Sequence, residues 1–313
     1  MAEAGAVVSR QELAQMQSLP LQAKIIKSLH RIEEWLNYWY GLAYVSYSGG
    51  KDSEVLLWLA RQVDSSIPAV FLNTRMEYPE IVRHVREHGN VTTIFPSVTP
   101  LQVIQRHGYP VVSKQVSRYV RELRNPLISE KRKAQLLHVG KDRTKMQYRL
   151  SYKWRFLLDA PFKIDDVCCK YLKHYPVQKY ERRTKRKPIV GTKASDSSQR
   201  YSSYLNTGCN FISQYRSISS PISFWTDQDV LECIRHKNLP LCPVYGEIIE
   251  EDGKLKCSGV GSTGCVFCSF GAHMESYPNR YQRLKESHPK LYKVCMENFG
   301  MREVLDYVGI PYE

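Results

Sequence analysis

The sequence predicts an α/β protein built on a parallel, twisted sheet that helices cover on both faces. Short apolar runs alternate with stretches of helical periodicity between residues 42 and 108. That alternation is typical of parallel strands joined by helical crossovers. The hexapeptide SGGKDS, residues 48–53, stands where the first strand is expected to meet a helix. Hydrophobic residues make up 42% of the 313 positions, which is enough for a packed core.

The N-terminal elements follow from periodicity and punctuation. Residues 21–39 place apolar side chains at spacings of three and four, which indicates an amphipathic helix. Gly89 and the pair Thr99 and Pro100 are suited to end one helix and begin the next. The strands expected here are 42–48, 69–74 and 91–98, and the helices between and after them are 53–63, 78–89 and 99–108.

The rest of the chain predicts fewer regular elements. Thr226 and Asp229 are spaced as a capping box at the start of a helix. The elements expected are basic helices over 114–160, a strand with a turn over 188–195, a helix over 226–238, and helical spacing over 277–308.

Two domains are therefore predicted. Residues 1–240 form the α/β domain, with a basic helical insertion at 114–185. Residues 241–313 form a Cys-rich segment followed by helices, and a bound metal organises such a Gly- and Cys-rich stretch more readily than a core of its own.

Composition also bears on the compartment. No apolar run approaches the roughly 18 residues of a membrane span, and the first twenty residues lack the features of a signal peptide. We expect a soluble, cytoplasmic protein with no membrane partner. Its nine cysteines then suggest metal ligands more than disulfides.

The net charge of +14 is concentrated in one block. Residues 114–193 hold 23 Lys and Arg against 7 Asp and Glu. Such a block often faces phosphates, either of a nucleic acid (DNA or tRNA) or of a polyphosphate ligand. The alternative is a solvated helical surface, and the two are weighed equally. The aromatic residues interleaved with the charges are Tyr119, Tyr148, Tyr152, Trp154 and Phe156.

The hexapeptide has the chemistry of an anion site. A loop between a strand end and a helix start directs backbone N–H groups outward, and the helix dipole adds positive potential. Gly49 and Gly50 permit close approach, Lys51 adds a full charge, and Ser48 and Ser53 add hydroxyl donors. Asp52 fits such a site if it orients a donor or helps hold Mg²⁺. The spacing matches neither the Walker loop nor the dinucleotide loop.

In this context SGGKDS resembles the pyrophosphate-binding loop of the adenine nucleotide alpha-hydrolase superfamily, whose fold is Rossmann-like. The resemblance implies that ATP is bound at residues 48–53 and cleaved between its α and β phosphates, with Lys51 and Asp52 as catalytic residues. It also implies that Thr74, after the second strand, approaches the adenosine.

Two cysteine pairs suggest one metal site. Cys168 and Cys169 are adjacent, and Cys265 and Cys268 form a C-x-x-C among glycines. A remote cysteine pair together with a C-x-x-C favours a four-thiolate centre over a redox pair. Thiolate ligation suits an iron–sulfur cluster or zinc, and the spacing does not choose between them.

Residues 40–275 resemble the PAPS reductase family. CCKYLKHYP is similar to its CC-x-x-x-K-x-x-P segment, and GTKASDSSQR, residues 191–200, to its substrate-binding stretch. The resemblance implies nucleotide contacts from Gly191, Lys193, Ser197 and Arg200. It also implies a 4Fe–4S cluster on Cys168, Cys169, Cys265 and Cys268, with Cys257 or Cys209 as substitutes for one ligand. Cys233, Cys242 and Cys295 are expected to be structural.

Two departures favour ATP over PAPS. The chain lacks the C-terminal E-C-G-[IL]-H segment that carries the nucleophilic cysteine of sulfonucleotide reductases, and its loop keeps the full SGGKDS. Within the family it is most similar to members from bacteria and their phages, including the ATP pyrophosphatase component of DNA phosphorothioation systems.

The function expected is therefore an ATP pyrophosphatase that activates an acceptor, with nucleic acid as one candidate, for sulfur transfer from a donor or partner protein. Reduction of APS or PAPS is the first alternative. A non-catalytic module that binds nucleotide and nucleic acid and senses redox state is the second.

Overall fold

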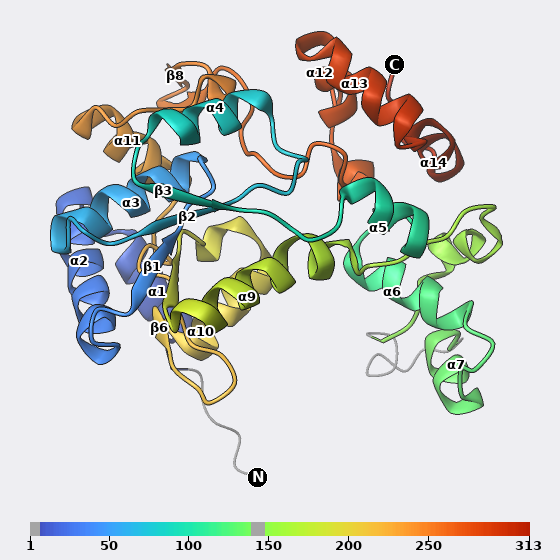
Figure 1. Ribbon diagram of the computed structural model, residues 1–313, viewed down its shortest axis with the longest axis horizontal. Helices are drawn as coiled ribbons and strands as arrows, with labels where there is room; N and C mark the ends of the chain where they lie inside the picture. Colours follow the sequence, from blue (N-terminus) through green and yellow to red (C-terminus); the bar gives the residue numbers. More distant parts are fainter. Residues whose placement is uncertain (1–6, 139–147) are drawn as a thin grey trace. The chain divides into compact units, whose positions relative to one another are not determined.

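The computed structural model describes residues 7–138 and 148–313, which divide into two units (Figure 1). The first unit runs to residue 73 and continues with 77–95 and 177–263; the second comprises 74–76, 96–176 and 264–313. This division differs from the predicted boundary at residue 240, because the second unit combines the segment after the third strand with the C-terminal segment. Residues 139–147 of the predicted basic block lie outside the described residues.

The first unit is built on a six-stranded sheet of order β3-β2-β1-β5-β7-β6. All neighbouring strands pair in parallel except β6 and β7, which pair antiparallel. The central strand β1 is flanked by β2 and β5, and its Ser46 pairs with Val70 on one side and Val190 on the other. The strands are β1 (Ala43–Ser46), β2 (Ala69–Leu72), β3 (Val91–Ile94), β5 (Lys187–Val190), β6 (Asn210–Phe211) and β7 (Ile218–Ser219).

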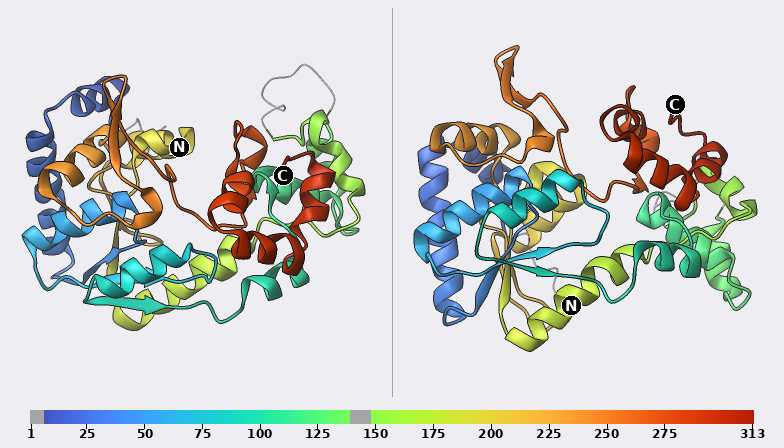
Figure 2. Two further views of the ribbon diagram at one scale, coloured as in Figure 1. Left: turned by 90° about the horizontal axis from the view of Figure 1, so that it is seen from above. Right: turned by 45° about the horizontal axis from the view of Figure 1, so that its top comes forward.

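Helices lie on both faces of this sheet, as predicted (Figures 1 and 2). On one face lie α3 (Lys51–Val63), which packs against β1, and α4 (Pro79–Glu87). On the opposite face α9 (Tyr175–Thr184) brings the ring of Tyr180 against Tyr44 and Val70. The predicted α/β class with a mostly parallel sheet is therefore confirmed.

The other helices of the first unit are tied to these layers. α2 (Leu21–Tyr38) and α11 (Asp227–Lys237) pack on α3, and the predicted capping box of Thr226 and Asp229 starts α11. The remaining elements are α1 (Arg10–Gln17), α10 (Ser198–Thr207), the short 3₁₀ turns η3 (Ala194–Asp196) and η4 (Pro243–Tyr245), and the hairpin of β8 (Ile248–Glu251) and β9 (Lys254–Cys257).

The second unit is mainly helical. Its two short strands, β4 (Val111–Val112) and β10 (Ser269–Phe270), pair in parallel and join its two chain segments. Its helices are α5 (Pro100–His107), α6 (Lys114–Leu123), α7 (Glu130–Leu136), α12 (Arg280–Ser287), α13 (Pro289–Lys293) and α14 (Met301–Val308), with 3₁₀ segments η1 (Tyr152–Asp159) and η5 (Ala272–Met274) and π-helical turns η2 (Lys170–His174) and η6 (Val294–Asn298).

None of the helices in the described part of the chain combines the length and the apolar character needed to cross a membrane.

Candidate nucleotide site and cysteine group

The topology marks one edge of the sheet as the place for a ligand. From β1 the chain adds β2 and then β3 on one side, and it later returns to add β5 on the other. Ligands of parallel α/β sheets bind outside the carboxyl ends of the strands at such a reversal. The loop after β1 and the segment after β5 therefore begin side by side, since Ser46 pairs with Val190.

The loop after β1 is organised by its own serines. The Ser48 N–H donates to Ser53 Oγ at 3.1 Å, and the two hydroxyl oxygens lie 3.0 Å apart. Ser53 Oγ donates to the Gly50 carbonyl at 2.8 Å. The residues predicted to bind pyrophosphate thus form a closed turn at the start of α3, with Gly50 as its N-cap.

Both glycines of the loop are required by their surroundings. Gly49 has a φ of +72°, and a Cβ there would lie 2.9 Å from Val85 Cγ2 on α4. A Cβ on Gly50 would lie 2.8 Å from the Tyr245 hydroxyl. Tyr245 and its hydrogen-bond partner Thr263, 3.0 Å away, were not predicted as site residues.

Two buried lysines share three aspartates beside the loop. Lys51 Nζ lies 2.7 Å from Asp227 Oδ1 and 3.2 Å from Asp52 Oδ2. Lys193 Nζ pairs with Asp52, and it lies 3.0 Å from Asp196 Oδ1 and 3.4 Å from Asp227 Oδ1. Lys51 and Lys193 are only 6% and 1% exposed, so the strand ends bring two cations into one protected place.

Neighbouring charges offset the effect of burial on the pKa of Lys51 and of Asp227. Burial alone would lower the pKa of Lys51, but Asp52 and Asp227 raise it above the ordinary lysine value. Burial would likewise raise the pKa of Asp227, but the hydrogen bond from Lys51 and the charge of Lys193 lower it. Asp227 was not among the predicted site residues, although it directly follows the Thr226 N-cap.

The predicted stretch 191–200 reaches the loop in part. A Cβ on Gly191 would lie 3.1 Å from the Asp52 carbonyl oxygen, so this glycine packs on the loop backbone. Ser197 caps α10 through the Arg200 N–H, and the Arg200 guanidinium pairs with Asp196. Ser197 and Arg200 therefore connect to the lysine pair through Asp196.

A buried carboxylate supports the first turn of α3. Glu54 accepts hydrogen bonds from the Tyr47 hydroxyl at 2.5 Å and from His88 Nε2 at 2.7 Å, and its Oε2 lies 3.3 Å from His84 Nε2. Burial would raise the pKa of Glu54, but these partners lower it to about 2. The i,i+4 spacing of His84 and His88 on one helix is the sequence signal that this cluster offered.

Thr74 lies two residues beyond β2, is 1% exposed, and belongs to the second unit. Its predicted approach to the adenosine stays a prediction.

The four predicted cysteine ligands all belong to the second unit. Cys168 and Cys169 precede the π-helical turn η2, a feature often found at functional sites. Cys265 and Cys268 lie in one turn, in which the Cys268 N–H donates to the Cys265 carbonyl at 3.1 Å. Arg280 donates to the Cys268 carbonyl at 2.7 Å, and Cys268 leads into β10.

The cysteines of each pair act on the pKa of the other pair. The hydrogen bond with Cys169 and burial raise the pKa of Cys168, and the charges of Cys268 and Cys265 raise it further. The same hydrogen bond, helped by Lys114, Lys173 and His174, lowers the pKa of Cys169 to about 5.

Among the described residues, no group of three or more His, Cys, Asp or Glu is arranged so that it could hold a metal ion. The metal centre at these four cysteines therefore stays a prediction. The backbone N–H of Phe270 also lowers the pKa of Cys268 against the effect of burial, as a hydrogen bond to a ligand sulfur does.

The two substitute cysteines lie in the first unit. Cys209 has its sulfur 3.9 Å from the Tyr204 hydroxyl, and it lines a pocket of about 480 Å³ with residues of α1 and α2. Cys257 ends β9, and although burial raises its pKa, the charges of Lys51, Asp227 and Asp52 act on its thiol. A thiol therefore lies within electrostatic range of the nucleotide loop, which sequence reasoning did not find. The three cysteines expected to be structural, Cys233, Cys242 and Cys295, are buried.

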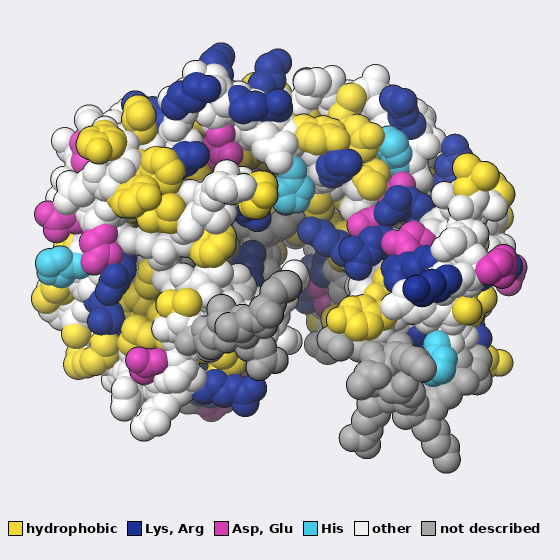
Figure 3. All heavy atoms as spheres, turned by 90° about the horizontal axis from the view of Figure 1, so that it is seen from below, with side chains coloured by type: hydrophobic (Ala, Val, Ile, Leu, Met, Phe, Trp, Pro, Cys, Tyr) yellow, Lys and Arg dark blue, Asp and Glu magenta, His cyan; other side chains and the backbone are white. Residues whose placement is uncertain are grey.

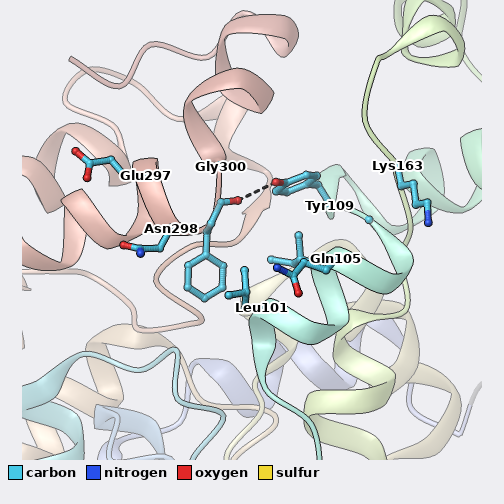
Figure 4. A pocket seen from close by; sticks show the side chains of 10 residues that line it. Leu101, Gln105, Tyr109, Lys163, Glu297, Asn298 and Gly300 are labelled. Atoms are coloured by element: carbon cyan, nitrogen blue, oxygen red, sulfur yellow. Dashed lines mark hydrogen bonds between the residues drawn. The ribbon is translucent and has the colours of Figure 1, made fainter.

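A second pocket, of about 270 Å³, lies in the second unit between α5 and the turn before α14 (Figure 4). Tyr109 donates to the Phe299 carbonyl at 2.8 Å in its wall. Lys163 and Glu297 point away from one another in this view. None of the predicted site residues lines this pocket, so the candidate chemistry lies elsewhere.

Comparison with known proteins gives one family. The model of the phosphoadenosine phosphosulfate reductase domain matches residues 43–98 and 109–270, more than half of the chain. Among solved structures, the phosphoadenylyl-sulfate (PAPS) reductase from Candida auris, a phosphate complex, is 12% identical with a TM-score of 0.41; the match covers 80% of this chain and 100% of that one. No curated protein matches the sequence.

Proposed function

The chain belongs to the phosphoadenosine phosphosulfate reductase domain family, and from this we propose that it binds ATP at residues 48–53 and releases pyrophosphate. Homology to this family supports an enzyme. The released energy would activate an acceptor for sulfur transfer. The observation that carries the proposal is the pair of buried lysines, Lys51 and Lys193. They lie beside a complete SGGKDS turn, at the point where the order in which strands are added to the sheet reverses.

The proposed step is a displacement at the α-phosphorus. An acceptor oxygen forms a bond to this phosphorus while the bond to the oxygen that bridges the α and β phosphates breaks. Pyrophosphate leaves with that oxygen. Lys51 and the N–H groups at the start of α3 stabilise the negative charge that develops on the leaving group. Asp52 holds both lysines in place, and bound Mg²⁺ would supply further charge neutralisation on the phosphates.

The cysteine group is proposed to hold a 4Fe–4S cluster, with zinc as the alternative. Cys168, Cys169, Cys265 and Cys268 are the ligands proposed, and they would hold it within the second unit. When bound, the cluster supplies redox capacity or a sulfur-binding site. The subtype that we propose is the ATP pyrophosphatase component of DNA phosphorothioation systems.

Pyrophosphate release from ATP by protein purified without oxygen tests the ATP proposal. We expect release by the natural chain and a loss of about 10²- to 10³-fold in Lys51→Ala, the usual effect of removing one charge-stabilising group. Lys179→Ala, which changes an exposed lysine on α9, is the matched control. ATP binding without product under every acceptor condition would instead favour the non-catalytic sensor.

One observation favours a second candidate, the reduction of APS or PAPS. The charges of Lys51, Asp227 and Asp52 act on the pKa of Cys257. A thiolate at Cys257 is therefore a candidate to attack the sulfonucleotide sulfur and release the nucleotide. A second thiol from a thiol reductant would then release sulfite and leave a disulfide. Sulfite formation that disappears in Cys257→Ser but persists in Cys233→Ser would establish this reaction in place of the first.

A further inference from the structure

The surface of the second unit carries a short segment in which aromatic and basic side chains alternate. The segment is Tyr152-Lys153-Trp154-Arg155-Phe156 at the start of η1. Tyr152 is 81% exposed and Phe156 is 40% exposed. Lys153 Nζ lies 4.9 Å from the centre of the Trp154 ring, and Arg155 Cζ lies 5.3 Å from that of Tyr152. Tyr152, Lys153 and Phe156 are therefore exposed together, whereas Trp154 and Arg155 are half-buried.

The backbone beneath these side chains is firmly held. The Arg124 guanidinium donates four hydrogen bonds of 2.6–3.0 Å to carbonyls at and after the end of η1, those of Leu157, Leu158, Ala160 and Phe162. Leu157 is fully buried. Tyr307 Oη donates to the Phe156 carbonyl at 2.9 Å, and their ring centres lie 5.7 Å apart. The backbone that carries the exposed rings is therefore held in place by hydrogen bonds.

Residues 148–158 carry Arg149, Lys153 and Arg155 and no Asp or Glu, and Asp159 follows them. Two carboxylates of the second unit form ion pairs with arginines. Glu122 Oε2 lies 2.7 Å from Arg132 Nε, and Asp165 Oδ1 lies 3.0 Å from Arg121 Nε. Arg155 also donates to the Leu137 carbonyl at 2.8 Å, which ties η1 to the end of basic helix α7. Figure 3 shows Lys and Arg side chains in the right half of the view with Asp and Glu between them, and further Lys and Arg side chains elsewhere on this face.

We propose that the surface formed by Tyr152, Lys153, Trp154, Arg155 and Phe156 binds single-stranded nucleic acid. Unpaired bases offer flat faces that stack on exposed rings, whereas the faces of duplex bases are already stacked. The basic side chains between the rings are suited to the phosphates that link successive bases. That this nucleic acid is the acceptor of the proposed reaction rests on the proposed function, whereas the binding itself requires no ATP.

The test is fluorescence anisotropy of labelled oligonucleotides of about 20 nucleotides, several times the smallest site sizes of such proteins, with the full chain and no ATP. Single-stranded DNA, single-stranded RNA and a DNA duplex form three arms. We expect either single strand to bind more tightly than the duplex, and Tyr152→Ala to weaken that binding about 5- to 100-fold. Lys153→Ala should reduce the slope of log affinity against log salt by about one.

Tyr215→Ala is the matched control, because Tyr215 is 90% exposed and belongs to the first unit. Equal effects of the two tyrosine variants, equal binding of duplex and single strand, or equally potent competition by polyglutamate would each overturn the proposal. Failure to release pyrophosphate alongside intact, Tyr152-dependent binding would overturn the proposed function alone.

Discussion

The nucleotide loop and the cysteine group handle charge in opposite ways. Around the loop, buried cations are held by carboxylates: Lys51 and Lys193 share Asp52 and Asp227. Around the cysteine group, cations act on thiols. The hydrogen bond with Cys168, together with Lys114 and Lys173, lowers the pKa of Cys169, and Arg280 opposes the burial that raises the pKa of Cys268.

This difference teaches what each site requires of a ligand. An anionic ligand at the loop has to compete with carboxylates that already hold the lysines. A metal centre at the cysteine group would have to displace protons, because thiolate ligation releases them. The hydrogen bond with Cys169 and burial raise the pKa of Cys168, and burial raises that of Cys268. The loop is therefore ordered by the protein's own groups, whereas the proposed metal binding at the cysteine group would require exchange of protons for metal.

The largest expected effect concerns the cysteine group. Cys168→Ser and Cys265→Ser should each lose most of the bound iron, because a ligand is removed from each of the two pairs. Cys209→Ser is the matched control and should keep it, since Cys209 contacts Tyr204 in the first unit. Iron and sulfide assays on protein purified without oxygen measure this. Stoichiometric zinc in colourless protein would show that the metal is the alternative one.

The next effect tests whether the loop is rigid. Gly49→Ala should lower the free energy of unfolding by about 2–3 kcal/mol and weaken ATP binding, because the left-handed backbone and the contact with Val85 both oppose a Cβ. Urea unfolding and ATP titration measure the two quantities. Gly253→Ala, with a φ of +69° and open space around it, isolates the backbone cost. Equal losses in both variants would mean that the Val85 contact has no consequence.

A similar loss is expected below the loop. Glu54→Gln should cost about 3 kcal/mol, since the pKa of Glu54 is lowered from 4.5 to about 2 in a buried site. A lowered carboxyl pKa stabilises the fold above pH 4.5, and that stabilisation is lost as the pH falls towards 2. The gap between the two proteins should therefore be full at pH 6 and close on acidification.

His88 contributes with the opposite sign. Its hydrogen bond to Glu54 raises the pKa of His88 above 6.5, so its contribution is full below pH 6.5 and is lost as the pH rises past the folded value. His236→Gln, in an exposed pair with Glu232, serves as control for His88→Gln. Thermal unfolding across pH 5–9 distinguishes them, and a pH-independent gap for His88→Gln would contradict the assignment.

The smallest expected effect concerns competition at the loop. Asp227→Asn should tighten ATP binding by up to about fivefold, because the side chain is 61% exposed and such pairs are individually weak. Equilibrium titration with ATP measures it, with Asp64→Asn, at a half-buried aspartate outside the lysine network, as control. Weaker binding would instead show that Asp227 contacts the nucleotide or its Mg²⁺.

The sequence predicted local features better than distant ones. The loop was predictable because Ser48 to Ser53 are contiguous and their partners are one another. Lys51 and Lys193 were each predicted as site residues, but their link through Asp227 was not. Asp227 reaches them through the folding of the sheet rather than through sequence spacing. The β8–β9 hairpin was missed, although Asp252 and Gly253, both with positive φ, are a hairpin signal. Helix α1 was also missed, although the capping box of Ser9 and Glu12 is a signal for the start of a helix.

The pairing of β4 with β10 has a consequence for the order of folding. The second unit takes one cysteine pair from the segment before α9 and the other from the segment after residue 263. During synthesis the sheet strands up to β7 emerge before Cys265 and Cys268 exist, so the first unit can fold while the second still lacks half of its thiols. A cluster on these four cysteines would therefore be completed only after residue 268 is made, on a chain whose nucleotide loop is able to form earlier.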